Sequence, residues 1–312
     1  MPLSPSDLHG IVPAVVTPLS SDDKPDLHAL RRHIRILIEE GSHGILLLGT
    51  TGEGPSMGIA ERESILEAGL EAAGEAFVMV GTATPSLQDT LQLTRRAYQL
   101  GTHIAVVLPP YYYKKVPDRG LLDFYQRLLA EAVPSDGMMM VYHIPQVTQV
   151  PLSFSLLEDL IRVSNGRLVG IKDSSGDWEH ARQLCSRFPE IHVFVGTDRL
   201  LLPGLELGAS GCITAGANIL APLAVAVYRA FTSGENAQGI QSTLTAAREV
   251  LERYQPFPAT LKSLLALRYG GDSWHLRPPL VTLSKSDQGN LLSALQALEL
   301  ETHLPWLNQL DN

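Results

Sequence analysis

A single lysine, Lys172, stands where an apolar, strand-like run turns polar, in the stretch RLVGIKDSSGD at residues 167–177. The chain has six lysines, and this one alone ends such a run. Burial disfavours the charged form of an amine, and a neutral lysine amine can attack a ketone and form a Schiff base. The alternative interpretation is a structural ion pair with Asp173 or another carboxylate. Position alone favours neither interpretation.

Schiff-base chemistry also needs groups that carry protons, and hydroxyl-bearing residues follow other apolar runs. Tyr142 lies in the run at 138–145 and could act as acid and base, with Thr50 or Thr51 passing the proton to a second tyrosine. Strand tyrosines are more often core residues with a bonded hydroxyl. The three consecutive tyrosines at 111–113 are equally typical of a packing or interface cluster.

The turn GTTGE at residues 49–53 is suited to binding an anion. Its glycines at 49 and 52 let backbone N–H groups converge beside two threonine hydroxyls. Such a concave site accepts a carboxylate as readily as a phosphate, although Gly-Thr turns are also common in ordinary loops. We interpret Glu53 as a turn or helix-start residue rather than a catalytic group.

The elements that would position these residues alternate regularly. Eight nearly continuous apolar runs are typical of strands buried on both faces of a parallel sheet, at 10–18, 44–54, 77–85, 103–113, 138–145, 168–175, 192–198 and 211–216. Stretches of helical period lie between or after them, at 27–41, 60–74, 87–101, 119–133, 153–163, 177–187, 199–208 and 222–232. This order predicts a (β/α)8 barrel, whose active-site residues gather at the C-terminal ends of the strands. An open doubly wound sheet is the alternative, but no glycine-rich dinucleotide motif follows the first run.

The pattern changes near residue 233. Residues 1–233 are expected to form the barrel with its active site, and residues 234–312 a helical segment packed on it. Three further helices are expected in that segment, near 235–253, 258–269 and 287–299. We expect the segment to contribute to contacts between subunits.

Composition disfavours several classes of protein. The 312 residues carry a formal net charge of −9 without a basic cluster, which disfavours nucleic-acid binding. No apolar run reaches the length of a membrane span, and residues 1–10 lack the features of a signal peptide. The two cysteines, Cys185 and Cys212, are interpreted as buried residues of a reduced, cytoplasmic protein.

No cofactor is predicted. The ten histidines show no paired metal-ligand spacing such as HExxH, which disfavours a metal-dependent aldolase. No dedicated phosphate site is evident for pyridoxal phosphate. His143 is the one histidine at a predicted strand end, and we interpret it as a hydrogen-bond donor, a polar filler or a residue that sets substrate specificity.

Several motifs together resemble the dihydrodipicolinate synthase and N-acetylneuraminate lyase superfamily of class I, pyruvate-handling aldolases. They are GTTGEGPSM at 49–57, VYHIP at 141–145, GIKDSSGD at 170–177 and the block at 196–222. The likeness runs in order and spacing from about residue 10 to about residue 268.

This resemblance implies a homotetramer, a dimer of dimers, and a role for each matching residue. Lys172 would form the imine, and Tyr142 would be the central acid and base. Thr50 would relay protons, and Tyr112 would complete the relay across the dimer interface. The expected substrate-binding residues are Thr50, Thr51, Gly196, Ile213 and His143.

One segment departs from the pattern of dihydrodipicolinate synthases, which typically read Tyr-Asn-Val-Pro-x-Arg-Thr-Gly after the strand-five tyrosine. The arginine of that pattern binds the carboxylate of the second substrate. Here the segment reads YHIPQVTQVP, with Val147 at the arginine position, Gln149 at the glycine and His143 at the asparagine. Because valine cannot pair with a carboxylate, we expect a neutral or apolar second half of the substrate, or a different orienting group.

The leading hypothesis is a Schiff-base-forming lyase that acts on a 2-oxo acid. The reaction would be pyruvate-dependent aldol cleavage or addition, or dehydration of a 2-keto-3-deoxy sugar acid. Alternatives are a 4-hydroxy-tetrahydrodipicolinate synthase, which joins pyruvate to aspartate semialdehyde, and a non-catalytic barrel of the same family. The intact lysine, tyrosines and threonines argue against the last. The expected partner is a small 2-oxo acid, with no nucleic acid and no membrane.

Overall fold

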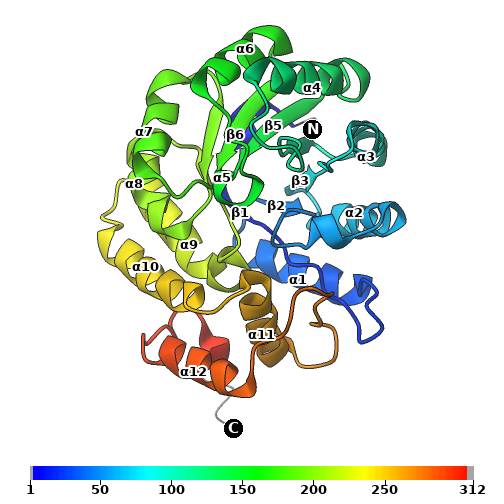
Figure 1. Cartoon of the computed structure of the whole chain (residues 1–312). Coiled ribbons are helices and arrows are strands. Elements are labelled where there is room, and N and C mark those ends of the chain that lie inside the picture. The colour runs from blue at the N-terminus through cyan, green and yellow to red at the C-terminus, as the bar shows by residue number, and fades with distance from the viewer. Residues whose placement is uncertain (1–2, 308–312) are drawn as a thin grey trace.

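Eight parallel strands form the inner layer of the chain in a computed structural model that describes residues 3–307 (Figure 1). The strands are β1 (Gly10–Pro13), β2 (Gly44–Leu47), β3 (Phe77–Gly81), β4 (Ile104–Val107), β5 (Met138–His143), β6 (Leu168–Asp173), β7 (His192–Val195) and β8 (Gly211–Thr214). Their spatial order is β1-β8-β7-β6-β5-β4-β3-β2, and a parallel bridge between Ala14 and Leu46 joins the two ends. The predicted (β/α)8 barrel is confirmed.

Helices surround these strands and continue beyond them (Figure 1). The barrel helices are α1 (Leu27–Glu39), α2 (Ile59–Ala73), α3 (Leu87–Leu100), α4 (Asp118–Glu131), α6 (Phe154–Ser164), α7 (Trp178–Arg187), α8 (Leu201–Glu206) and α9 (Ala217–Thr232). Short elements are α5 (Pro145–Thr148) and the 3-10 turns η1 (Pro5–Asp7), η2 (Gly54–Ser56) and η3 (Asp198–Leu200). The C-terminal segment forms α10 (Gln238–Glu252), α11 (Phe257–Tyr269) and α12 (Lys285–Gln296).

One helix begins earlier than its sequence pattern predicts. We expected it to start at Pro222, but α9 starts at Ala217. Leu220 has non-helical backbone angles, so the helix kinks there. Proline lacks an N–H and fits the first turn of a helical segment, which explains why helical structure can precede Pro222 only across such a kink.

The C-terminal helices share a hydrophobic core with the barrel. Leu244, Leu261 and Leu291, one from each helix, are fully buried in the same cluster as residues of α1, α2 and α9. The two parts that the sequence divides at residue 233 are therefore packed together. Of the cysteines, Cys212 is buried and Cys185 is half-buried, and burial raises the pKa of both thiols.

An irregularity in β6 decides which residues of this strand face the inside of the barrel. Leu168 pairs with Met139, but the next pair joins Gly170 to Met140, so one extra residue is inserted in β6. Leu168 belongs to the outer layer of apolar residues, and strict alternation from it would also turn Lys172 outward. Because of the inserted residue, Lys172 turns to the inside of the barrel and pairs with Tyr142. A side chain at Gly170 would not fit, because its Cβ would lie 2.5 Å from the carbonyl oxygen of His192.

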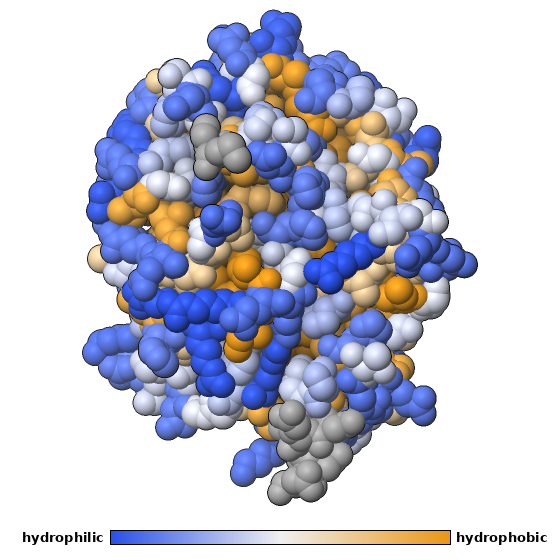
Figure 2. All heavy atoms as spheres, turned by 180° about the vertical axis from the view of Figure 1, so that it is seen from behind, coloured by the Kyte–Doolittle hydropathy of each residue, from blue (hydrophilic) through white to orange (hydrophobic). Residues whose placement is uncertain are grey.

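The outer surface mixes hydrophilic and hydrophobic residues. In the view of Figure 2, hydrophilic residues cover much of the molecule and hydrophobic ones show between them in separate patches. Among residues 3–307, no helix combines the length and the apolar character that crossing a membrane requires.

Candidate active site

Lys172 and Tyr142 lie side by side at the C-terminal ends of β6 and β5. They are register partners, and Nζ of Lys172 lies 4.1 Å from the centroid of the Tyr142 ring. Only 4 % of Lys172 and 5 % of Tyr142 is exposed. The amine therefore faces the inside of the barrel, next to a phenol.

A cavity of about 490 Å³ opens beside this pair. Six residues expected at the site from the sequence line it: Thr50, Thr51, Tyr142, Lys172, Gly196 and Ile213. They come from five different strands or the loops after them, so only the closed barrel brings them together. Their chemical roles in this chain remain predictions.

The phenol of Tyr142 is tuned by its surroundings. Burial raises its pKa, but the charge of Lys172 and side-chain hydrogen bonds with Thr50, Ser174 and Lys172 outweigh burial, so the pKa lies below the ordinary value of 10. A phenol with a lowered pKa gives up and takes back a proton more readily near neutral pH. Tyr142 thus lies next to the amine of Lys172 with a pKa below that of an ordinary phenol.

Ser174 is a site residue to which the sequence analysis gave no role. It lines the cavity and its side chain is hydrogen-bonded to Tyr142. The alternation of side chains along an extended chain could have revealed it, because Ser174 follows Lys172 by two positions and points to the same side. The signal is weak, because serines are common after strands.

Hydrogen bonds to two of its backbone carbonyls hold the turn after β2. The N–H of Glu53 donates to the carbonyl of Thr50 over 3.2 Å, and the hydroxyl of Thr17 donates to the carbonyl of Gly52 over 2.7 Å. Thr51 is buried, and both threonines face the cavity. This arrangement can present hydroxyl and amide donors to a carboxylate.

His143 lies on the other face of β5, away from the cavity that Tyr142 lines. Its Nδ1 accepts a hydrogen bond from the Leu152 N–H, and its ring stacks on His180 with centroids 4.5 Å apart. Burial and His180 lower the pKa of His143 to about 4, against the opposing effect of Asp173. The expectation that His143 binds substrate is not supported, because neighbouring strand residues face opposite sides and Tyr142 faces inward.

One cluster has the spacing of a metal site. Its ligand atoms, from His143, Asp173 and His180, all lie within 4.8 Å of one another. Nδ1 of His180 lies 3.0 Å from the carboxylate of Asp173. The two imidazole planes are only 18° from parallel in their stack. Since an imidazole donates to a metal within its own plane, stacked rings cannot aim at one ion, and the cluster is better described as a hydrogen-bonded support behind β5 and β6.

Tyr112 does not reach the cavity of its own chain. Its side chain is 71 % exposed, and its ring meets that of Tyr113 edge to face, with centroids 5.3 Å apart. Val147, at the position of the missing arginine, is 57 % exposed and also does not line the cavity. Instead Gln146, its neighbour in α5, lines the cavity and donates to the carbonyl of Ser174 over 2.6 Å.

Charged residues form the wall of the cavity farther along, toward the C-terminal helices. Arg199, Arg248 and Glu252 line it. Nη1 of Arg248 lies 2.7 Å from the fully buried carboxylate of Asp198, and Nε donates to Glu252 over 2.9 Å. Nη2 of Arg199 lies 3.4 Å from the other oxygen of Glu252. This distal wall, defined here as Arg199, Arg248 and Glu252, offers both donors and an acceptor.

Known proteins resemble this chain in both sequence and fold. A model of the dihydrodipicolinate synthetase family matches residues 7–298. An uncharacterized DapA-like lyase of Chloroflexus aurantiacus is 40 % identical, over 93 % of this chain and 96 % of the relative. A 4-hydroxy-tetrahydrodipicolinate synthase of a Synechococcus species is 31 % identical, over 95 % and 97 %. The crystal structure of YagE from E. coli K12, a protein of the dihydrodipicolinic acid synthase family in complex with pyruvate, is 28 % identical, with a TM-score of 0.88 and coverage of 94 % and 99 %.

Proposed function

Because the chain belongs to the dihydrodipicolinate synthetase family, we propose that it is a lyase that acts on a 2-oxo acid through a Schiff base at Lys172. The observation that carries this proposal is the buried pairing of Lys172 with Tyr142 at the mouth of a cavity. The family itself makes the chain a lyase of the class I aldolase type. The pyruvate bound in the YagE crystal structure supports a pyruvate-type substrate.

The geometry supports the following order of steps. Lys172 attacks C2 of the 2-oxo acid through the unprotonated form of its amine, and one amine proton passes to the ketone oxygen. Tyr142 donates the second proton to that oxygen, which leaves as water. The resulting iminium accepts the electron pair of the C3–C4 bond while Tyr142 removes the proton from the C4 hydroxyl. An aldehyde departs, Tyr142 passes the proton to C3 of the enamine, and hydrolysis of the imine releases pyruvate and the amine. Addition is the reverse sequence.

Thr50, Thr51 and Ser174 serve this chemistry in supporting roles. The turn that carries the two threonines holds the carboxylate of the pyruvate moiety, next to Gly196 and Ile213 on the cavity wall. Thr50 and Ser174 exchange protons with Tyr142 through the hydrogen bonds described above. Tyr112, which is exposed in a single chain, would complete the relay in a second copy, as part of a homotetramer.

The distal wall supports a hydroxylated second half of the substrate. A hydroxyl both donates and accepts, so a chain of hydroxyls can bind Arg199, Arg248 and Glu252 without displacing their ion pairs. An anionic group would be repelled by Glu252 and would have to compete with it for Arg199. A 2-keto-3-deoxy sugar acid, cleaved or dehydrated, therefore fits better than aspartate semialdehyde.

Reduction with borohydride in the presence of pyruvate tests the proposal. We expect a mass gain on the peptide that contains Lys172 and none on the peptide that contains Lys262, the other buried lysine. A Lys172→Met variant is the matched control and should gain no mass. An unmodified Lys172 peptide at saturating pyruvate would refute the proposal.

A second experiment separates the enzyme from its alternatives. It measures turnover with and without EDTA. The substrates are a panel of hydroxylated aldehydes with pyruvate, and 2-keto-3-deoxy sugar acids. Turnover that survives EDTA supports the imine mechanism over a metal-dependent one. Imine formation without turnover of any substrate would favour a non-catalytic barrel, and preference for aspartate semialdehyde would favour the synthase.

A further inference from the structure

A buried ion pair joins the C-terminal segment to the turn after β2. Oε1 of Glu53 lies 2.5 Å from Nζ of Lys262 in α11, and each side chain is only 1 % exposed. The same Nζ donates to the carbonyl of His275 over 2.6 Å. Burial lowers the pKa of Lys262, and the negative charge of Glu53 opposes that effect. Since an unpaired buried charge is strongly destabilising, each partner fixes the position of the other.

Glu53 adopts a backbone conformation that needs support. Its φ is +54°, in the left-handed region that residues other than glycine rarely occupy. Such conformations persist where the surroundings hold them. The N–H of Glu53 bonds to the carbonyl of Thr50, so the angles of Glu53 help to set the path of the turn that carries both cavity-facing threonines.

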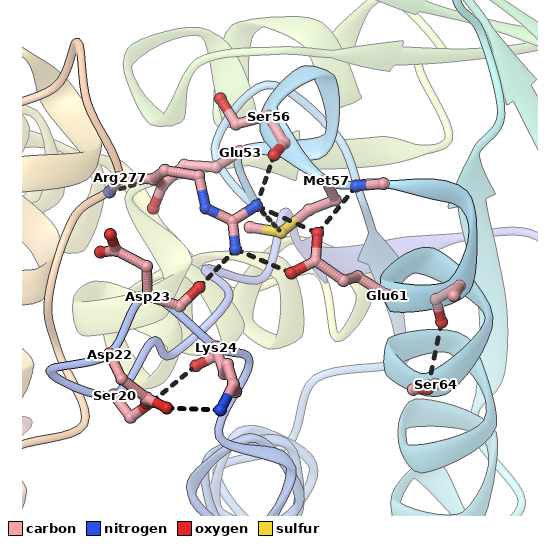
Figure 3. Close-up of polar contacts among 12 residues, drawn as sticks. Ser20, Asp22, Asp23, Lys24, Glu53, Ser56, Met57, Glu61, Ser64 and Arg277 are labelled. Carbon is pink, nitrogen blue, oxygen red and sulfur yellow. Dashed lines mark hydrogen bonds and ion pairs between the residues drawn. The ribbon is translucent and has the colours of Figure 1, made fainter.

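A second contact from the C-terminal segment holds the next part of the same loop (Figure 3). The guanidinium of Arg277 makes two bonds to the carboxylate of Glu61, at 2.8 and 3.0 Å, and donates to the carbonyl of Ser56 over 2.6 Å. It also bonds to the carbonyl of Asp23. Figure 3 shows Arg277 reaching between these groups, which come from two parts of the chain, the loop before α1 and the segment that joins η2 to α2.

The contacts of the Glu53 carboxylate come from outside the barrel. Within residues 3–307, its ion pair is with Lys262, and the backbone N–H of Arg277 lies 3.5 Å from its other oxygen. Both partners belong to the C-terminal segment. The barrel strands therefore place the turn, while the C-terminal segment holds its one charged side chain.

We propose that Glu53 and Lys262 are positioning residues, through which the C-terminal segment sets the geometry of the turn that binds the substrate carboxylate. The inference rests on the proposed function, because it takes Thr50 and Thr51 as the carboxylate site. It assigns Glu53 a role in substrate affinity although Glu53 does not touch the substrate. It also gives the C-terminal segment a part in the reaction beyond packing.

The test measures half-saturation of imine formation by pyruvate, read as the yield of reduced adduct on Lys172 against pyruvate concentration. In Lys262→Met the half-saturating concentration should rise about tenfold, equivalent to weakening one charge-assisted hydrogen bond to the carboxylate. The adduct yield at saturation should stay at the wild-type level, because Lys172 and Tyr142 are untouched.

Arg268→Met is the matched control. Arg268 also lies in α11 and forms an ion pair with Glu40, next to α1, with side chains 10 % and 17 % exposed. Its loss removes another link between the C-terminal segment and the barrel without touching the turn. Half-saturation by pyruvate should stay within about twofold of wild type in this variant, the usual independence of distant sites.

The double variant Glu53→Gln with Lys262→Met separates positioning from stability. It leaves no unpaired buried charge, so it should fold even where Lys262→Met alone does not. It should keep the raised half-saturation, because the tether of the turn is still absent. Wild-type affinity in a folded Lys262→Met or double variant would overturn the inference, whereas the absence of any adduct in the wild type would refute the proposed function instead.

Discussion

A Cβ atom placed on Gly196 would lie 2.1 Å from Oγ of Ser174 and 2.6 Å from its Cα. Gly196 directly follows β7 and Ser174 directly follows β6, and the two backbones touch at the wall of the cavity. This close approach lets the hydroxyl of Ser174 reach Tyr142. The requirement for glycine is steric, since no rotation of Ser174 can move its Cα.

Gly196→Ala should lower kcat/KM by about a hundredfold, the cost of moving catalytic groups by the order of an ångström. The clash would displace Ser174 and with it the hydrogen bond to Tyr142. Steady-state kinetics measures the effect. Gly239→Ala, in α10, has no heavy atom within 4 Å of the new Cβ and should leave kinetics unchanged. Equal activity of both variants would contradict the steric requirement.

Tyr142→Phe should reduce kcat by about 10²- to 10⁴-fold, the usual contribution of a general acid or base. The pKa of Tyr142 is lowered, so the acid form is lost as pH rises through a value below 10. The wild-type kcat should therefore fall on the alkaline side below pH 10, and this limb should be missing in the variant. A pH profile of kcat for both proteins checks the prediction, and an unchanged alkaline limb would contradict it.

Glu252→Gln should raise KM for a hydroxylated aldehyde about tenfold, the range for losing one charged hydrogen-bond acceptor. Half-saturation by pyruvate in borohydride trapping should not change, since Glu252 lines the distal wall and not the turn after β2. Glu249→Gln, an exposed neighbour in α10, serves as control. Equal KM values in the two variants would remove the distal wall from substrate recognition.

Folding should weaken in acid because of a buried histidine. His33 is fully buried between Asn218, 3.0 Å from Nε2, and Tyr269, 3.1 Å from Nδ1. Burial lowers its pKa to about 4. A lowered folded pKa means that His33 supports folding above pH 6.5 and that this contribution, about 3 kcal/mol, is lost as pH falls from 6.5 toward 4.

The measurement is urea unfolding at pH 7 and pH 4.5 in wild type and in His33→Gln. The variant should lose less stability between the two pH values, since glutamine does not titrate in this range. His43 and His143 also have lowered pKa values and also lower the free energy of unfolding as pH falls. The free energy of unfolding should therefore still decrease in acid in the variant. An identical loss in both proteins would contradict the assignment to His33.

Much of the fold followed from local pattern, because short apolar runs and amphipathic stretches are local signals. The order of elements predicted the barrel, and barrel geometry placed Thr50, Tyr142, Lys172 and Gly196 at one rim. Alternation along β5 turns His143 away from the cavity that Tyr142 lines, against the expectation that His143 binds substrate. The helix start at Ala217 was missed because Pro222 was read as a boundary rather than a kink.

The amino-acid sequence by itself determined that a lysine ends a buried strand in a barrel. Only the tertiary structure decided that this lysine faces inward, because alternation from Leu168 alone points Lys172 to the outer layer and one inserted residue in β6 reverses it. Likewise, nothing local relates Glu53 to Lys262, whose pairing depends on α11 folding back over the barrel. The inserted residue in β6 and the ion pair between distant segments form only when those segments pack together, so the local pattern of apolar residues does not reveal them.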